Sequence, residues 1–181
     1  MPPPPLARDK VLDAFEHLLV EKGERAATME AIAAQAGVSK GGLIYHFNSK
    51  DALVEGLDQR LRVRCEEDLE LMKVAPEGQV GYFLRTSALA DTPFDRTLVA
   101  ATRLRSHAVA REGLVWVQRR WFDTLMEVVH DEDVARTVML IGDGLYYNAA
   151  STALPDAGLG VGDIDGIVRL VEKLVGQSTA G

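Results

Sequence analysis

Apolar residues recur along this chain with the spacing of amphipathic helices. Residues 8–22 carry such a stripe at i, i+3 and i+4, which ends at Gly23: Val11, Phe15, Leu18 and Leu19. The longest stripe begins after Ser49 and stops at Pro76: Leu53, Leu57, Leu61, Cys65, Leu69 and Met72. A helix of roughly 24 residues spans about 36 Å, which is enough to connect one domain to another.

Other periodic segments predict further helices, and none alternates with the period of a strand. Helices are expected at 28–36, 39–46, 76–90, about 94–109, 112–130, 133–153 and 163–176. Residues 154–163 are expected to form a glycine-rich loop. The chain is therefore predicted to be all-α, with about nine helices. The proposed division is a disordered leader at 1–7, a helix-turn-helix domain at 8–50 and a larger helical domain at 51–181.

Residues 28–50 have the pattern of two short helices joined by a tight turn. Thr28 and Ser39 can cap the two helix starts, and Gly37 stands where the chain must turn. Leu43 and Phe47 lie four residues apart and can pack on the first helix. The opposite face keeps Lys40, Gly41, Gly42, Tyr45 and His46. This pattern predicts a helix-turn-helix, in which the second helix enters the major groove, although any αα-hairpin shares the glycine turn and apolar seam.

The charge of the chain changes how DNA binding is expected to work. The net charge is −7, yet residues 1–50 hold six basic and six acidic residues, so that segment is neutral. Residues 51–181 hold fourteen basic and twenty-one acidic residues and carry all of the excess. The basic groups near the DNA must therefore be positioned on one face, because they do not supply a broad positive field.

The composition also bears on location and chemistry. The chain has no apolar run of 18 residues and its start lacks the apolar core of a secretory signal, so we expect a cytoplasmic protein without a membrane span. The single cysteine, Cys65, fits a reducing compartment and lies in an apolar stripe, where a core role is expected. The four histidines are scattered, and no nucleophile motif or phosphate loop is present. We expect no catalytic residues, no metal and no cofactor.

The segment GVSKGGLIYHFNSKDAL, residues 37–53, resembles the recognition-helix signature of the TetR family of bacterial transcriptional repressors. The resemblance covers about the first quarter of the chain and implies DNA-contacting roles. Thr28 matches a phosphate-contacting position, and Ser39, Lys40, Gly41 and Gly42 match the leading edge of the recognition helix. Tyr45, His46 and Lys50 match positions that hold the DNA backbone. Lys40 is the best candidate for a guanine edge or a nearby phosphate.

Two positions depart from the family pattern and leave the operator sequence open. Many relatives have Thr or Asn where Gly42 stands, and Tyr where Ile44 stands. Gly42 cannot read a base with a side chain, and Ile44 can offer only an apolar contact or belong to the core. For Tyr45 and His46, local packing at the helix end is the alternative to phosphate contact.

A single module of this kind reads only a few base pairs, which implies a homodimer with two modules about 34–36 Å apart. In TetR-like proteins the last two long helices form the dimer interface, and burial against their own subunit is the alternative. The interface candidates here are Val134, Val138, Ile141, Leu145, Ile164, Ile167, Val168, Val171, Leu174 and Val175.

The resemblance also implies an effector pocket in the larger domain, although aromatic residues in a bundle are more often plain core. The candidates are Tyr82, Phe83, Arg103, His107, Trp116, Trp121, Phe122, Tyr146, Tyr147 and Asn148. The acidic balance there mildly favours a cationic or neutral lipophilic effector. The expected function is a homodimeric repressor that its effector releases from double-stranded operator DNA. An activator, a ligand-independent regulator, and a helical interaction adaptor with a structural helix-turn-helix are the alternatives.

Overall fold

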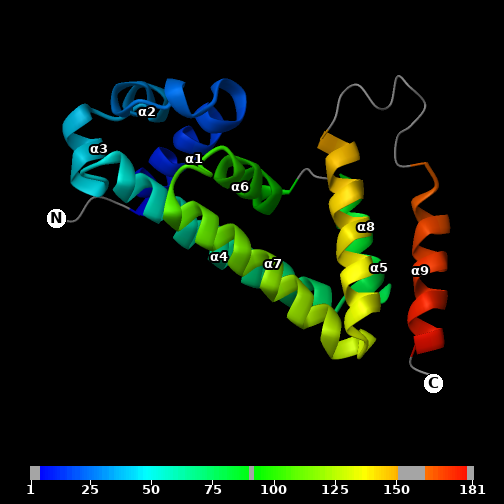
Figure 1. The fold of residues 1–181 in the computed structure, drawn as a ribbon. Helices are drawn as coiled ribbons and strands as arrows, with labels where there is room; N and C mark the ends of the chain where they lie inside the picture. Colours follow the sequence, from blue (N-terminus) through cyan, green and yellow to red (C-terminus); the bar gives the residue numbers. More distant parts are fainter. Residues whose placement is uncertain (1–4, 90–91, 151–161, 179–181) are drawn as a thin grey trace. The chain divides into compact units, whose positions relative to one another are not determined.

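The computed structural model describes residues 5–89, 92–150 and 162–178, and every regular element in these ranges is helical (Figure 1). This confirms the all-α prediction. The helices, in chain order, are α1 (Pro5–Lys22), the 3-10 helix η1 (Glu24–Ala26), α2 (Met29–Ala36), α3 (Lys40–His46), α4 (Lys50–Lys73), α5 (Gly78–Leu89), α6 (Pro93–Thr102), α7 (Ala108–Val129), α8 (Glu132–Ala150) and α9 (Ile164–Ser178).

Two predicted boundaries are wrong. Helix α1 begins at Pro5, so residues 5–7 are helical and only residues 1–4 of the expected leader lie outside the described residues. Proline fits this place because the first helical turn needs no backbone donor. The helix expected at 94–109 ends at Thr102, where Arg103 and Leu104 donate to carbonyls only three residues back, at 3.1 and 3.0 Å. Most of the predicted glycine-rich loop at 154–163 lies outside the described residues.

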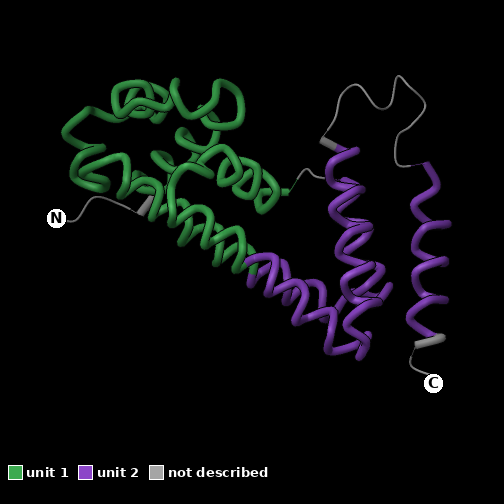
Figure 2. Tube along the Cα trace, viewed as in Figure 1, with its two compact units in different colours: residues 1–65, 92–116 green, residues 66–91, 117–181 purple. Residues whose placement is uncertain are grey.

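The chain folds into two compact units (Figure 2). The first consists of residues 1–65 and 92–116, and the second of residues 66–91 and 117–181. Residues 92–116 thus belong to the same compact unit as the helix-turn-helix, although they follow it by more than forty positions in the sequence. The predicted domain division at residue 50 stays a prediction.

The first unit is built around α1, whose apolar stripe is fully buried. Phe15 and Leu19 have no exposed surface, and neither do Ile32 of α2 and Leu43 of α3. One continuous cluster joins these side chains to Leu53 and Leu57 of α4 and to Ala100, Leu104 and Ala110 from the α6–α7 segment. The helix-turn-helix is therefore fixed to its own unit by the removal of apolar surface from water.

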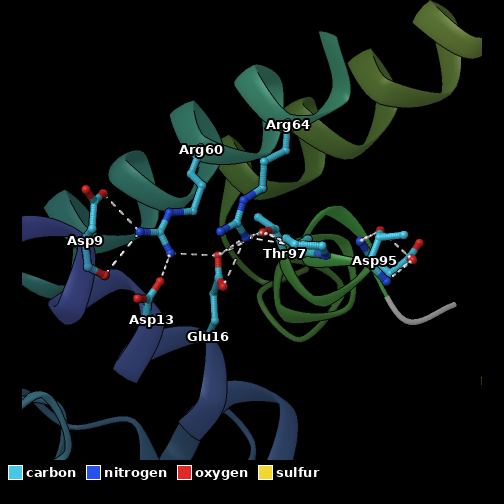
Figure 3. Close-up of polar contacts among 9 residues, drawn as sticks. Asp9, Asp13, Glu16, Arg60, Arg64, Asp95 and Thr97 are labelled. Atoms are coloured by element: carbon cyan, nitrogen blue, oxygen red, sulfur yellow. Dashed lines mark hydrogen bonds and ion pairs between the residues drawn. The ribbon is translucent and has the colours of Figure 1, made fainter. Parts of the chain in front are cut away.

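A buried carboxylate joins three helices of this unit (Figure 3). Glu16 of α1 is only 7% exposed and accepts hydrogen bonds from Arg60 at 3.2 Å and Arg64 at 3.1 Å, both on α4. Thr97 of α6 donates to the same carboxylate at 2.9 Å, and the Arg64 guanidinium also contacts the Thr97 hydroxyl. Arg60 in addition reaches Asp13 at 2.6 Å. Charge burial is tolerated here because each ionised group has partners.

The second unit is held by α5, which packs against both α8 and α9. Phe83 of α5 is 4% exposed, and its ring meets the Trp121 ring of α7 edge-on with centroids 5.6 Å apart. Gly142 of α8 lies against the Phe83 ring, and a Cβ there would come within 2.7 Å of Phe83 Cζ. The close packing of α5 on α8 therefore depends on a glycine at this position.

The contact between Gly142 and Phe83 predicts a destabilised variant. Gly142→Ala should lower the free energy of unfolding by about 1–3 kcal/mol, because the buried Phe83 ring must move to admit the methyl group. Gly41→Ala is the matched control, since its Cβ would meet nothing closer than Ser39 Oγ at 4.0 Å, and alanine favours the helix by up to about 1 kcal/mol. Thermal unfolding followed by circular dichroism measures both, and equal losses of stability in the two variants would contradict the packing described.

Candidate nucleic-acid interface

The two short helices α2 and α3 are fixed by their caps. Thr28 Oγ1 accepts from the Ala31 backbone N–H at 3.2 Å, and Ser39 Oγ accepts from the Gly42 N–H at 3.0 Å. Gly37 between the helices has φ 66°, a left-handed conformation that favours glycine. Thr28 and Ser39 are thus occupied as N-caps, as their sequence positions predict. The phosphate contact expected of Thr28, and the place of Ser39 at the leading edge of the recognition helix on DNA, remain predictions.

The outer face of α3 is open to solvent. Tyr45 is 68% exposed and Ile44 is 44% exposed, whereas Leu43 and Phe47 are buried in the core. A Cβ at Gly41 would meet almost nothing, so the backbone of α3 can be approached closely there. Exposure of Ile44 decides the question that the sequence left open, because the side chain faces outward and does not belong to the core.

His46 is partly engaged in local packing. Its ring meets the Tyr45 ring at 90° with centroids 5.3 Å apart, and the residue is half-buried. Tyr45 itself projects into solvent. The local-packing alternative therefore describes His46 better than Tyr45, and Tyr45 is the stronger candidate for a DNA contact.

Lys40 forms an ion pair that the sequence analysis missed. Its ammonium lies 2.7 Å from the Glu30 carboxylate of α2, and both side chains are about two-thirds exposed. The hydrogen bond from Lys40 lowers the pKa of Glu30 from its usual value. An ion pair this exposed contributes little to stability, so Lys40 can exchange Glu30 for a phosphate or a base edge.

Lys50 is held at the start of α4 by η1. Its ammonium donates to the Glu24 carbonyl at 3.0 Å and lies 3.8 Å from the Glu24 carboxylate. That carboxylate also bonds His107 Nε2 at 2.9 Å and accepts from Ser106 Oγ at 3.3 Å. The His107 hydrogen bond, together with the Lys50 charge, lowers the pKa of Glu24. The sequence predicted a phosphate-contacting lysine here but gave no sign of Glu24, because its partners are 26 and more than 80 residues away.

The two units carry opposite net charge. The first unit holds thirteen basic and eleven acidic residues, a net of +2, and the second holds seven and sixteen, a net of −9. The first unit is positive because residues 92–116 add four arginines and only two carboxylates. The helix-turn-helix is therefore part of a more basic body than the neutral residues 1–50 suggest.

The predicted pocket residues are divided between the units. The first unit contains Arg103, His107 and Trp116, while the second contains Tyr82, Phe83, Trp121, Phe122, Tyr146, Tyr147 and Asn148. His107 is bonded to Glu24, and Arg103 is exposed at the end of α6, because the helix ends at Thr102 and not at the predicted 109. Phe83 is buried in the core, which is the alternative that the sequence analysis named for these aromatic residues. Tyr147 is 70% exposed.

Other aromatic candidates have partners in their own units. The Tyr82 hydroxyl donates to Asp68 at 2.9 Å. Trp116 lies under the Arg62 guanidinium and Phe122 under that of Arg136, at 4.8 and 5.5 Å. Two cavities of about 330 and 210 Å³ open beside α1 in the first unit, and no pocket candidate lines either of them. The effector pocket remains a prediction.

The interface candidates on α8 and α9 also separate into two groups. Four are buried within their own unit: Val138, Leu145, Val168 and Val171. Burial within the subunit is the alternative that the sequence left open, and the part of these four residues in a dimer interface stays a prediction. Leu174 is 40% exposed, and the half-buried candidates are Val134, Ile141, Ile164, Ile167 and Val175. The sequence analysis missed the exposed apolar residues Leu140 and Leu170 on these helices, and Tyr147, which it assigned to the pocket, is exposed on α8.

Among the described helices, none combines the length and apolarity that crossing a bilayer requires. In the part of the chain that the structure describes, no cluster of three His, Cys, Asp or Glu side chains is arranged to hold a metal ion.

Comparisons with known proteins agree with this geometry. Residues 11–57 match the family model described as bacterial regulatory proteins, tetR family. The HTH-type transcriptional regulator BetI of Rhizobium meliloti is 27% identical over 165 residues, which is 83% of this chain and 81% of the relative. The chain spans a smaller part of two other relatives. It matches 25% of the length of the HTH-type regulator YvkB of Bacillus subtilis and 34% of the length of UidR of Escherichia coli.

Solved structures share the fold over nearly the whole chain. The multidrug binding protein EbrR, solved with malachite green, superposes with a TM-score of 0.68 at 18% identity, covering 92% of this chain and 96% of EbrR. A transcriptional regulator from Saccharomonospora viridis, solved with choline, gives 0.68 at 16% identity and covers 93% of this chain and 95% of the other. The similarity therefore extends from the helix-turn-helix through the remaining helices.

Proposed function

Because this chain belongs to the TetR family of bacterial transcriptional regulators, we propose that it is a homodimeric repressor that a small-molecule effector releases from operator DNA. The outward face of α3 is the observation that carries the DNA-binding part. Gly41, Ile44 and Tyr45 are exposed there, and Lys40 is held only by a solvent-exposed ion pair. A short helix with an open backbone and a solvent-exposed cation at its start suits the major groove.

The roles of individual residues in this proposal follow from their surroundings. Lys40 contacts a guanine edge or a phosphate at the front of α3, and Tyr45 contacts the backbone. Lys50, fixed by the Glu24 carbonyl, presents its charge at the start of α4. Ile44 offers an apolar contact, such as one with a thymine methyl group.

Substitutions on this face provide the main test. Lys40→Ala and Tyr45→Ala should each weaken binding to DNA from upstream of the chain's own gene by about tenfold or more, because each removes a contact of roughly 1–3 kcal/mol. Gel-shift titration at one fixed salt concentration measures the affinity. Arg119→Gln, at an exposed position on α7 of the second unit, is the control and should bind like the wild type. Unchanged affinity in both α3 variants would contradict the proposed interface.

Dimerisation through α8 and α9 is supported by their exposed apolar residues. Leu140 and Tyr147 are seven residues apart and share one face of α8, while Leu170 and Leu174 are four apart on α9. Gly144 lies between the two α8 residues, and a Cβ there would meet nothing within 4 Å, so another helix can approach closely. Exposed apolar faces of this kind mark association surfaces.

Leu140→Asp should separate the dimer. A charge placed in a desolvated contact is expected to cost about 2 kcal/mol or more, which raises the dimer dissociation constant roughly thirty-fold. Val115→Asp is the control, because Val115 is similarly exposed, at 65% against 70%, but lies on the first unit. Sedimentation equilibrium gives the mass of each variant. A wild-type monomer, or a Leu140→Asp protein that stays dimeric, would exclude this interface.

The effector is proposed to be a small organic cation or a neutral lipophilic compound. The second unit has a net charge of −9, and two fold relatives were solved with choline and malachite green, which are both organic cations. A ligand that prefers one packing of the bundle shifts the population toward it, and release of DNA follows when the preferred packing binds DNA less well.

Choline chloride and malachite green are suitable first probes. A compound that binds the native state should raise the melting temperature, and continue to raise it as its concentration exceeds the dissociation constant, and it should also dissociate the upstream DNA complex. Thermal shift and gel shift, run on the same samples, measure the two effects. A compound that raises the melting temperature yet tightens DNA binding would reverse the sign of the proposed regulation.

A further inference from the structure

The turn between α6 and α7, residues 103–107, carries two arginine side chains that have no acidic partner among the described residues. Arg103 and Arg105 are exposed, and among the described residues neither has an ion pair. Arg111 folds back and donates to the carbonyls of Arg105 and Ser106 at 2.9 and 3.1 Å, which fixes the shape of the turn. A fixed turn with outward cations is a defined surface, because its backbone is held while its charges remain free.

This turn lies against the start of α4 (Figure 1). His107 Nε2 bonds the Glu24 carboxylate at 2.9 Å, and His107 Nδ1 lies 3.8 Å from the Asp51 carboxylate. The backbone carbonyl of Glu24 accepts a hydrogen bond from Lys50, the lysine proposed to contact phosphate. One residue of η1 therefore fastens the turn and Lys50 side by side in the same unit.

Arg25 of η1 is a further cation, next in sequence to the residue that holds the turn. It follows Glu24 directly, is exposed, and has no ion pair within the described residues. Counting residues 22–25, 49–51 and 103–112 together, six basic side chains stand against three acidic ones. Of those three, Glu24 is already shared by Lys50 and His107, while Asp51 and Glu112 are exposed. The local excess is thus positive even though the whole chain is strongly acidic.

We propose that Arg25, Arg103 and Arg105, the basic turn surface, bind the sugar-phosphate backbone of duplex DNA outside the base pairs that α3 reads. This inference rests on the proposed DNA-binding function and extends its contact area beyond the helix-turn-helix. Duplex DNA is the fitting occupant because a regular array of phosphates matches spaced, flexible guanidinium groups and releases counterions when they bind. Such contacts add affinity without reading sequence.

Salt dependence of DNA binding separates this proposal from a structural role of the turn. The test compares wild type, the double variant R103Q/R105Q and the control R119Q on a random-sequence duplex of about 40 base pairs, from about 50 to 200 mM KCl. Fluorescence anisotropy gives the affinity at each salt concentration. Glutamine keeps most of the side-chain length, and all three positions are exposed, so far-UV circular dichroism should show the same helical content.

For R103Q/R105Q we expect the slope of log affinity against log salt to become shallower by about 1 for each phosphate that the variant no longer neutralises. The affinity should fall equally on the random duplex and on DNA from upstream of the chain's gene, and R119Q should keep the wild-type slope. A wild-type slope in R103Q/R105Q, with or without a drop in affinity, overturns the proposal. If the wild-type protein itself shows no salt-dependent DNA binding, the proposed function has failed, which is a different result.

Discussion

The ionised network around Glu16 is the interaction on which the first unit depends. This carboxylate lies almost entirely out of water and joins α1 to two arginines of α4 and to Thr97 of α6. Replacing both arginines would leave the Glu16 carboxylate buried without a compensating charge, and a buried charge left in that state costs roughly 3–5 kcal/mol. The network therefore adds directional contacts between three helices to the apolar packing that already joins them. Helices α2 and α3 pack on the helix that it holds.

Two sets of contacts hold the residues that are proposed to bind DNA. The apolar seam orients α3, and the caps at Thr28 and Ser39 fix where α2 and α3 begin. Glu24 then places Lys50 and the α6–α7 turn beside each other. Cations elsewhere on the unit, such as Lys40, are held only by exposed pairs. Because the backbone is held by these contacts while the lysine side chains are only weakly paired, the side chains can turn toward phosphates without a change in the backbone.

The sequence was sufficient to predict the features that arise locally. The 3.6-residue periodicity predicted the all-α class, and the cap residues and Gly37 predicted the turn between α2 and α3. Contacts between distant segments were not predictable in the same way. Nothing in the spacing indicated that Thr97 would reach Glu16, or that His107 would bond Glu24. The interface candidates show the same limit, because an apolar stripe on α8 or α9 does not reveal whether α5 or another subunit covers it. Val138 and Val168 are buried in the core of the second unit, whereas Leu140 and Leu170 are exposed.

The discontinuous first unit has a consequence for any attempt to transplant this DNA reader onto another regulator. A chimaera joined at residue 50 would keep α1 to α3 but would leave behind Arg60 and Arg64, which accompany Glu16. A joint at residue 65 would still lack Thr97 and the buried Ala100 and Leu104. The unit that would have to be transferred consists of two separate segments, residues 1–65 and 92–116, and a functional chimaera must contain both.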